Sequence, residues 1–158
     1  HFNASELQDG KLLIGVDEKL GPVSKSLVRD WCTGGKVTVQ PVINLAELSE
    51  DTEPAVDRHD PTDQIREIVL QRNQVCVFPG CNRDSRTCDL DHVRPYVPLD
   101  HGGERRQTRP SNLAPLCRFH HRVKTHTDWT YRIDDVGDAD WIAPDKTRYR
   151  KPAVIRRP

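Results

Sequence analysis

Two pairs of metal-ligand residues constrain this chain more than any other feature. Cys76 and Cys81 flank a Pro-Gly turn in CVFPGC, and Cys117 and His120 form a C-x2-H pair further along the chain. Ligands two to four residues apart can converge on one ion, and thiolates with imidazole are common ligands of tetrahedral Zn2+. On a helix, Cys117 and His120 lie one turn apart on the same face. The spacing therefore predicts a structural zinc site with these four ligands.

The other cysteines leave alternatives open at this site. Cys88 could replace His120 as the fourth ligand, but its position before the strand-like DLDH favours a place in the core. The thiols could also be buried and inert. The odd number of five cysteines, together with the lack of a secretory leader pattern, favours metal ligation over a disulfide framework. A zinc ion would help to stabilise a chain with few large apolar residues.

Length and charge limit the class of protein. The 158 residues, with 35% hydrophobic and 30% charged, suit one domain or one domain plus an appendage. Residues 1–70 hold 7 basic and 13 acidic side chains, whereas residues 71–158 hold 17 basic and 11 acidic ones. The basic second part can neutralise phosphates, although a charged run is more often a solvated face. The absence of an 18-residue apolar stretch or a leader predicts a cytoplasmic protein without a membrane span.

The first part of the chain is predicted to be a small α/β lead-in. Residues 11–17 and 36–45 have strand-like patterns, and residues 22–35 between them read as a short helix. Ser24 is the expected N-cap of this helix, and a Gly-Gly pair at 34–35 is its expected stop. The order suggests a βαβ-like unit, which carries no phosphate-binding glycine motif. The chain also starts without Met, so we expect the lead-in to be the tail of a longer upstream region.

The rest of the chain is predicted to form a second domain. Residues 46–60 are acidic and lack periodicity, so we interpret them as a linker and expect domains at 1–60 and 61–158. Pro61 suits the first position of a helix, in which apolar residues recur at helical spacing. The residues from 128 to 150 read as β-hairpins.

A further set of residues points to a family. The chain contains an Asp-His pair, a Gly-Gly pair, the segment SNLAPLC and a histidine followed by RVKTH, at Asp91-His92, Gly102-Gly103, residues 111–117 and His121. This order resembles the HNH endonuclease motif on a ββα-metal, or His-Me finger, fold, and the resemblance covers about residues 61–150. The chain is most similar to the C-terminal HNH domain of a large actinobacterial family with an upstream helical domain of unknown function.

The resemblance implies an α+β fold with a ββα-metal core and a zinc knuckle after the lead-in. In such a fold Asp91 and His92 end the first strand, and the loop and second strand carry the Gly pair. Ser111 would cap the helix that bears Asn112, Cys117, His120 and His121. The loop LDHGGERRQTRPS is longer than the usual connection in the family, which bears on the length of the second strand.

The resemblance also implies roles for individual residues. His92 would be the general base that accepts a proton from the attacking water, because a neutral imidazole prevails at pH 7. Asp91 and His121 would hold one catalytic cation, Mg2+ or Mn2+. Asn112 would pin the loop that carries His92, because an amide can donate and accept hydrogen bonds at once. Asp89 would support the cation through water.

The expected partner is DNA. Basic residues near the motif are the expected phosphate contacts, foremost Arg94, Arg118, Arg122 and Lys124, with Arg105, Arg106 and Arg109 as further candidates. The resemblance predicts an endonuclease that nicks DNA or cleaves it with weak specificity, because a small site has few side chains for reading bases. The alternative is a zinc-stabilised DNA-binding module without cleavage activity. A third interpretation, a zinc-dependent protein-interaction module, predicts no salt-dependent DNA binding.

Overall fold

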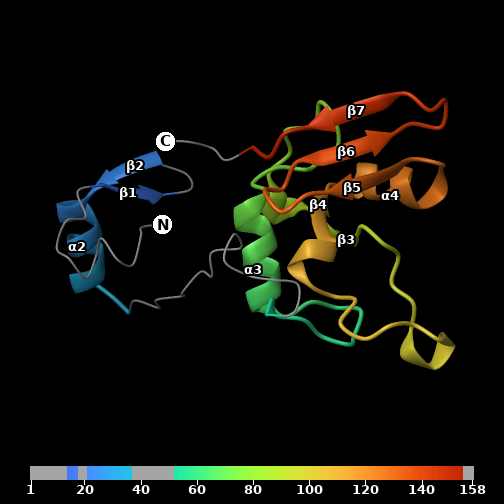
Figure 1. Cartoon of the computed structure of the whole chain (residues 1–158). Coiled ribbons are helices and arrows are strands. Elements are labelled where there is room, and N and C mark those ends of the chain that lie inside the picture. The colour runs from blue at the N-terminus through green and yellow to red at the C-terminus, as the bar shows by residue number, and fades with distance from the viewer. Residues whose placement is uncertain (1–13, 18–20, 37–51, 155–158) are drawn as a thin grey trace. The chain divides into compact units, whose positions relative to one another are not determined.

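The structure, a computed structural model, describes residues 14–17, 21–36 and 52–154 (Figure 1). In chain order the described elements are β1 (Ile14–Asp17), β2 (Gly21–Ser24), α2 (Lys25–Thr33), α3 (Asp63–Arg72), η2 (Ser85–Thr87), β3 (Asp89–His92), η3 (Leu99–His101), η4 (Pro110–Asn112), β4 (Leu113–Leu116), α4 (Arg118–His126), β5 (Thr130–Ile133), β6 (Ala139–Ile142) and β7 (Arg148–Lys151). The α+β class is thereby confirmed. None of the described helices is both long and apolar enough to cross a membrane. The chain divides into two compact units, residues 1–41 with 156–158 and residues 42–155.

The first unit contains a hairpin followed by a helix. Strands β1 and β2 pair antiparallel, and α2 follows directly. The Ser24 hydroxyl accepts a hydrogen bond from the Leu27 N–H, and Gly34 closes the helix with an N–H bond to Asp30. Both predicted caps are confirmed. Residues 22–24, which lead into the predicted cap, pair with β1 as part of β2, a strand that was not predicted from the sequence. The second expected strand, at 36–45, lies outside the described residues except for its first.

Helix α3 begins later than the sequence suggested. Thr62 is the N-cap, and its hydroxyl accepts a hydrogen bond from the Ile65 N–H at 3.3 Å. Pro61 therefore precedes the cap instead of occupying the first helical position, so that prediction was wrong. The buried residues of α3 are Ile65, Ile68, Val69 and Leu70. Ile65 and Val69 form one core cluster with Leu113 at the start of β4, so the helix supports the strand beside it.

The described part of the expected linker, residues 52–60, is bound by hydrogen bonds and an ion pair to the rest of the second unit. Buried Glu53 accepts hydrogen bonds from both the backbone N–H and the hydroxyl of Ser111. The Val56 N–H donates to the Thr108 carbonyl at 3.0 Å, and Arg105 forms an ion pair with Asp57 at 2.9 Å. These contacts join segments that are about fifty residues apart in sequence. The interpretation of residues 52–60 as a free linker was therefore wrong, and residues 46–51 lie outside the described part.

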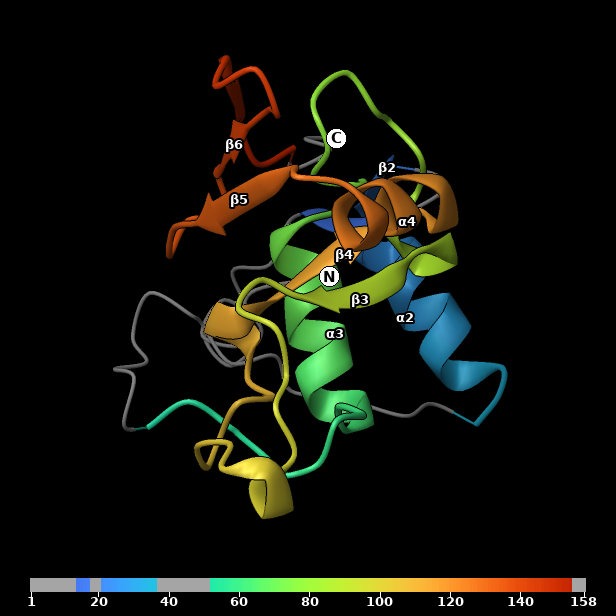
Figure 2. The same cartoon turned by 90° about the vertical axis from the view of Figure 1, so that its right-hand side faces the viewer.

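Strands β3 and β4 form an antiparallel pair, and α4 follows and lies against both strands (Figure 2). His92 at the end of β3 pairs with Leu113 at the start of β4. The prediction that Ser111 caps the long helix was wrong: Ser111 bonds to Glu53, and the buried segment Leu113–Leu116 is a strand. The Gly pair also lies outside the second strand, because Gly102 ends η3 with a φ of +83°.

The C-terminal sheet has the order β5-β6-β7, all antiparallel, and contains the hairpins expected from the sequence (Figure 1). Fully buried Trp141 on β6 stacks on Tyr131 of β5, with 4.2 Å between ring centroids. Its indole N–H donates to the Val77 carbonyl at 2.9 Å. Trp141 and Tyr131 belong to the same core cluster as Cys76 and Cys117, so the sheet packs directly beneath the predicted metal ligands.

Candidate metal centre and its neighbouring polar cluster

The four predicted zinc ligands converge in the structure. The ligand atoms of Cys76, Cys81, Cys117 and His120 all lie within 4.8 Å of one another, and among the described residues they form the metal-ligand cluster. The His120 Nδ1 atom lies 3.2 Å from the Cys117 sulfur and 3.6 Å from the Cys76 sulfur. Three thiols and one imidazole at this spacing could bind a metal such as zinc. The prediction of these ligands from sequence spacing agrees with this geometry.

Local structure brings the two ligand pairs together. Gly80 adopts a φ of +73°, and the Cys81 N–H donates to the Phe78 carbonyl, which closes the turn between the first two ligands. Cys117 is the N-cap of α4, so His120 lies in the first turn of that helix. The Phe78 ring stacks on the His120 ring, with 3.9 Å between centroids and 6° between planes. This stacking fixes the imidazole with Nδ1 toward the thiols.

The thiols of Cys76 and Cys81 hold their protons at neutral pH. The sulfur of Cys88 and burial raise the pKa of Cys76 well above its usual range. Burial is also the main cause that raises the pKa of Cys81 to about 11. Burial, together with Arg83, lowers the pKa of His120, so its imidazole is neutral and able to bind a cation. Metal binding must therefore displace protons from the thiols, and acid weakens it.

Cys88 is buried in the core, with 4% of its surface exposed. It lies outside the set of four mutually close ligand atoms, and its thiol donates to the Asp84 carbonyl at 3.4 Å. Contact with Cys76 lowers the pKa of Cys88. The arrangement favours His120 over Cys88 as the fourth ligand.

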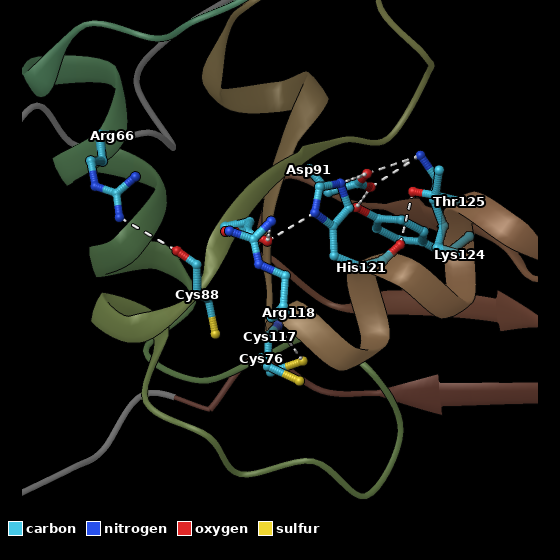
Figure 3. A network of polar contacts seen from close by, with 11 residues as sticks. Arg66, Cys76, Cys88, Asp91, Cys117, Arg118, His121, Lys124 and Thr125 are labelled. Carbon is cyan, nitrogen blue, oxygen red and sulfur yellow. Dashed lines mark hydrogen bonds and ion pairs between the residues drawn. The ribbon is translucent and has the colours of Figure 1, made fainter.

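A second cluster of polar side chains lies between β3 and α4 (Figure 3). The Nε2 atom of His121 lies 3.4 Å from the Asp91 carboxylate, and its Nδ1 atom lies 2.9 Å from Asp89. His121 thus bridges two acidic residues that alternate along one strand. Asp91 is 4% exposed and also accepts a hydrogen bond from the Tyr131 hydroxyl at 2.9 Å. The two predicted cation ligands, Asp91 and His121, are therefore neighbours.

Lys124 completes this cluster. Its ammonium lies 3.1 Å from the Asp91 carboxylate (Figure 3). The same ammonium donates to the His92 carbonyl at 2.7 Å. Only 14% of the Lys124 side chain is exposed. The charge of Lys124 is neutralised inside the protein, so the structure does not present it on the surface as a phosphate contact.

The hydrogen bonds of His92 fix which ring nitrogen carries the proton. Its Nε2 atom lies 2.8 Å from the Thr108 hydroxyl oxygen, which in turn lies 2.6 Å from the Arg58 carbonyl. A hydroxyl has one proton, and here it goes to the carbonyl, so the hydroxyl must accept from Nε2–H. Within the described part of the chain, the lone pair of Nδ1 has no hydrogen-bond donor. Burial, with His59 as the next cause, lowers the pKa of His92 to about 4, which keeps the ring neutral at pH 7.

His59 is a member of this site that sequence reasoning did not identify. Its ring centroid lies 5.0 Å from that of His92 and 5.3 Å from that of Tyr96, and its Nδ1 atom lies 2.9 Å from the Asp60 carboxylate. His59 precedes α3 and is 33 residues from His92, in a segment without a motif. No local pattern signals this contact, because it depends on the hydrogen bonds that hold residues 52–60 against the loop between β3 and β4.

Asn112 holds the chain that follows His92. Its side-chain oxygen accepts from the Arg94 N–H at 2.9 Å, and its amide donates to the carbonyls of Arg94 and Gln107. Asn112 is 7% exposed. The residue therefore ties the two ends of the long loop between β3 and β4 to each other, and this geometry suits the loop-pinning role expected for it.

The basic residues near the site fall into two groups. Arg94, Arg118 and Arg122 are exposed, although Arg118 forms an ion pair with Asp89 at 3.2 Å. The arginines of the long loop instead bind the segment 53–57: Arg105 pairs with Asp57, Arg106 donates to the Glu53 carbonyl, and Arg109 pairs with Glu53. These three residues hold the fold together.

Comparison with known proteins identifies relatives without an assigned activity. No family model and no solved structure matches the chain. It is 36% identical over 128 residues to the uncharacterized protein Rv3776 of Mycobacterium tuberculosis, a match covering 74% of the chain and 23% of the relative. It is 34% identical over 131 residues to the uncharacterized protein Rv2100 of the same organism, covering 82% of the chain and 21% of the relative. The chain thus spans less than a quarter of the length of these relatives.

Proposed function

We propose that this chain is a metal-dependent endonuclease of the HNH, or ββα-metal, class that hydrolyses phosphodiester bonds in DNA. One observation carries the proposal: the order β3-β4-α4 brings Asp91 and His92 of the strand within reach of His121 of the helix, 3.4 Å from Asp91. A general base with a free lone pair thus lies next to a carboxylate and an imidazole. Such a grouping suits metal-assisted hydrolysis.

His92 is the general base in this proposal. Its Nδ1 atom accepts a proton from a water molecule while the water oxygen attacks the phosphorus, and the bond from phosphorus to the leaving sugar oxygen breaks. Thr108 keeps the proton of the resting imidazole on Nε2. The lowered pKa of His92 leaves Nδ1 unprotonated over the whole neutral range. Asn112 positions the backbone just beyond His92.

Two residues are proposed to hold a divalent cation. The carboxylate of Asp91 and the Nε2 atom of His121 offer one oxygen and one nitrogen ligand, a set that suits Mg2+ or Mn2+ with further positions open to water and substrate. When bound, such an ion neutralises charge on the scissile phosphate and on the leaving oxygen. Tyr131 and Asp89 orient these two ligands through their hydrogen bonds.

A separate Zn2+ is proposed as a structural ion. Its ligands are Cys76, Cys81, Cys117 and His120, which leave no open position on a tetrahedral ion. Because Cys117 and His120 begin the helix that bears His121, the structural ion fixes the start of α4. It thereby holds His121 against β3, so the loss of zinc is expected to affect the catalytic cluster as well as stability.

DNA is the proposed substrate because exposed arginines lie on α4, which carries His121, and directly after β3, which carries Asp91 and His92. Arg94 follows β3, and Arg118 and Arg122 lie on α4. Side chains of this kind bind the phosphate backbone and carry little sequence information, so we expect nicking or weakly specific cleavage.

Lys124 favours a second candidate function, a zinc-stabilised DNA-binding module that does not cut. Its ammonium already forms an ion pair with Asp91 and would have to move before a cation could bind there. In that case the Asp91–Lys124 pair would be a structural contact between β3 and α4. The two candidates differ in whether the chain needs a divalent cation other than zinc.

The test is the conversion of supercoiled plasmid by the native chain, with Mg2+, with Mn2+ and without an added divalent cation. His121→Ala removes a proposed cation ligand but leaves the zinc ligand His120. His101→Ala, an exposed histidine in η3, is the control. The proposal expects cation-dependent nicking by the native chain and the control but not by His121→Ala. Salt-dependent DNA binding without cleavage, at full zinc content, would support the binding module instead.

A further inference from the structure

Helix α4 carries an exposed aromatic side chain that the proposed chemistry does not use. Phe119 is 69% exposed, the largest exposed fraction among the large hydrophobic residues that the structure describes. Its ring lies against His120 in a T-shaped contact, with 5.1 Å between centroids and planes at 72°. The ring therefore contacts the metal centre while most of its surface is open to solvent.

The Phe119 ring borders a shallow hollow of about 680 Å³. The residues that line it are Arg83, Cys117, Arg118, Phe119, Arg122, Val123, His126 and Thr127. Apolar atoms make up most of this lining, and the charged groups at its edge are basic. No acidic residue takes part. An apolar floor with a positive rim matches a ligand that has both a flat apolar surface and negative charge.

The hollow lies on a face of α4 different from that of the proposed catalytic residues. Arg122, Val123 and His126 follow Phe119 at helical spacing, so they share one side of the helix. His121 and Lys124 are directed toward Asp91 on β3 instead. One link joins the two faces, because Arg118 at the hollow pairs with Asp89, which also binds His121. A ligand in the hollow would thus lie beside the catalytic cluster.

The arginines of the hollow are available to an anion. Within the described part of the chain, neither Arg83 nor Arg122 has a carboxylate partner, and both are exposed. Arg83 lies on the loop between the metal ligand Cys81 and η2, whereas Arg122 lies on α4. The two guanidinium groups therefore approach the hollow from two different elements. Phosphates on both sides of one base could each meet a guanidinium group.

We propose that this hollow binds one unpaired nucleotide of the DNA, with its base stacked on Phe119 and its flanking phosphates on Arg83 and Arg122. An aromatic ring within a basic groove is the usual means of binding single-stranded nucleic acid, because every base has a flat face. A base within an intact duplex is covered on both faces and cannot stack on Phe119. The chain therefore prefers single-stranded or locally unpaired DNA to a continuous duplex.

This inference deepens the proposed function and rests on it for the identity of the substrate. It is tested by binding alone, so that its outcome does not depend on cleavage. Fluorescence anisotropy measures the affinity of the native chain, with its zinc and without an added divalent cation, for a short labelled oligonucleotide and for the same sequence as a blunt duplex. We expect tighter binding of the single strand.

Three variants of Phe119 separate stacking from other contacts. Phe119→Ala is expected to weaken single-strand binding by roughly 5- to 150-fold, the range for the loss of one stacked base, and to leave duplex binding nearly unchanged. Phe119→Leu keeps an apolar side chain but loses the ring, and is expected to behave like Phe119→Ala. Phe119→Trp keeps the ring and is expected to retain the preference. Val136→Ala, at a site that is 68% exposed in the turn before β6, is the matched control.

The arginines give a second measurement. Arg122→Gln is expected to lower the dependence of log affinity on log salt by roughly 0.7 for the single strand, the value for one phosphate contact. Arg148→Gln on β7, exposed and outside the hollow, serves as the control. An unchanged salt dependence in Arg122→Gln would contradict its proposed contact.

Several results would overturn the inference. Equal affinity for both forms of DNA, or a preference for the single strand that survives Phe119→Ala, would exclude a stacked base. An equal or greater affinity for RNA of the same sequence would overturn the assignment to DNA. Self-association that Phe119→Ala abolishes would instead make the hollow a contact between copies of the chain. If the native chain cleaves plasmid but Phe119→Ala binds the single strand as tightly as the native chain does, this inference alone is refuted. If Phe119→Ala loses single-strand binding but the native chain cleaves no plasmid, only the nuclease is refuted.

Discussion

Replacement of Cys81 by serine is expected to remove the zinc ion and to unfold the second unit. A structural zinc contributes roughly 10–16 kcal/mol to the folding of a small metal domain. A whole domain is stable by only about 5–15 kcal/mol. The ion therefore accounts for a share of stability that the remaining core cannot replace. Cys81 itself is partly exposed, so its own packing contributes little and the effect comes from ligation.

Cys88→Ser is the matched control for this experiment. Cys88 is more deeply buried than Cys81, but its sulfur is outside the ligand cluster and donates to a backbone carbonyl that a serine hydroxyl can also reach. We expect this variant to keep its zinc and to lose about 1 kcal/mol, the usual cost of a core substitution. If burial alone determined the loss of stability, Cys88→Ser would destabilise the chain more than Cys81→Ser.

The assay combines zinc content by atomic absorption with thermal unfolding followed by circular dichroism. The native chain and Cys88→Ser should each retain zinc and unfold cooperatively, whereas Cys81→Ser should contain none and show no cooperative transition. Zinc retained by Cys81→Ser with native stability, or zinc lost from Cys88→Ser, would refute the assignment of Cys76, Cys81, Cys117 and His120 as the ligands.

Three further predictions concern the polar cluster. The pKa of His92 is about 4 in the folded chain against a usual 6.5, so the unfolded chain takes up the proton first as the pH falls. The free energy of unfolding therefore decreases between pH 6.5 and pH 4. Denaturation of His92→Asn at several pH values should show a smaller decrease over this range. Thr108→Val should lower the cleavage rate roughly tenfold at unchanged zinc content, because the imidazole of His92 loses the hydrogen bond that keeps its proton on Nε2. An unchanged rate would contradict this role of Thr108. Tyr131→Phe removes one of the donors to buried Asp91 and should cost about 1–3 kcal/mol in urea denaturation, whereas exposed Tyr149→Phe should cost little.

The zinc ligands could be predicted from the sequence because their geometry is mostly local. Cys76 with Cys81 and Cys117 with His120 each form a short pair that one turn or one helix start can position. Only the meeting of the two pairs is a long-range event. The chemistry of thiols and imidazole limits the possible partners so strongly that the four residues could be matched without a structure.

The element between the Gly pair and α4 could not be predicted as readily. The segment LAPL is too short and too uniformly apolar for periodicity to distinguish a buried strand from a helix start. Pro115 within it has no N–H to donate. Its carbonyl accepts from the Val77 N–H outside the two-stranded sheet, so the missing N–H lies on the side of β4 away from β3 and costs no bond between the two strands. The strand is therefore determined by its pairing with β3, which is a tertiary contact.

His59, Thr108 and Glu53 were missed for the same physical reason. Each acts through a contact across a long stretch of sequence: His59 with His92, Thr108 with Arg58 and Glu53 with Ser111. The acidic composition of the segment that contains Glu53 suggested a linker, because composition does not reveal whether a carboxylate has a buried partner. Glu53 in fact binds two donors of Ser111 and is almost fully buried.

The most direct test of the central claim is the rate at which the native chain and His92→Ala cleave one labelled DNA under single-turnover conditions, with saturating Mg2+ or Mn2+ and equal zinc content. A general base contributes roughly 10²- to 10⁴-fold to such a reaction, so His92→Ala should be slower by that factor while it binds DNA as tightly as the native chain. Equal rates for the two proteins, or no cleavage by a native chain that is folded and loaded with zinc, would contradict the proposed nuclease.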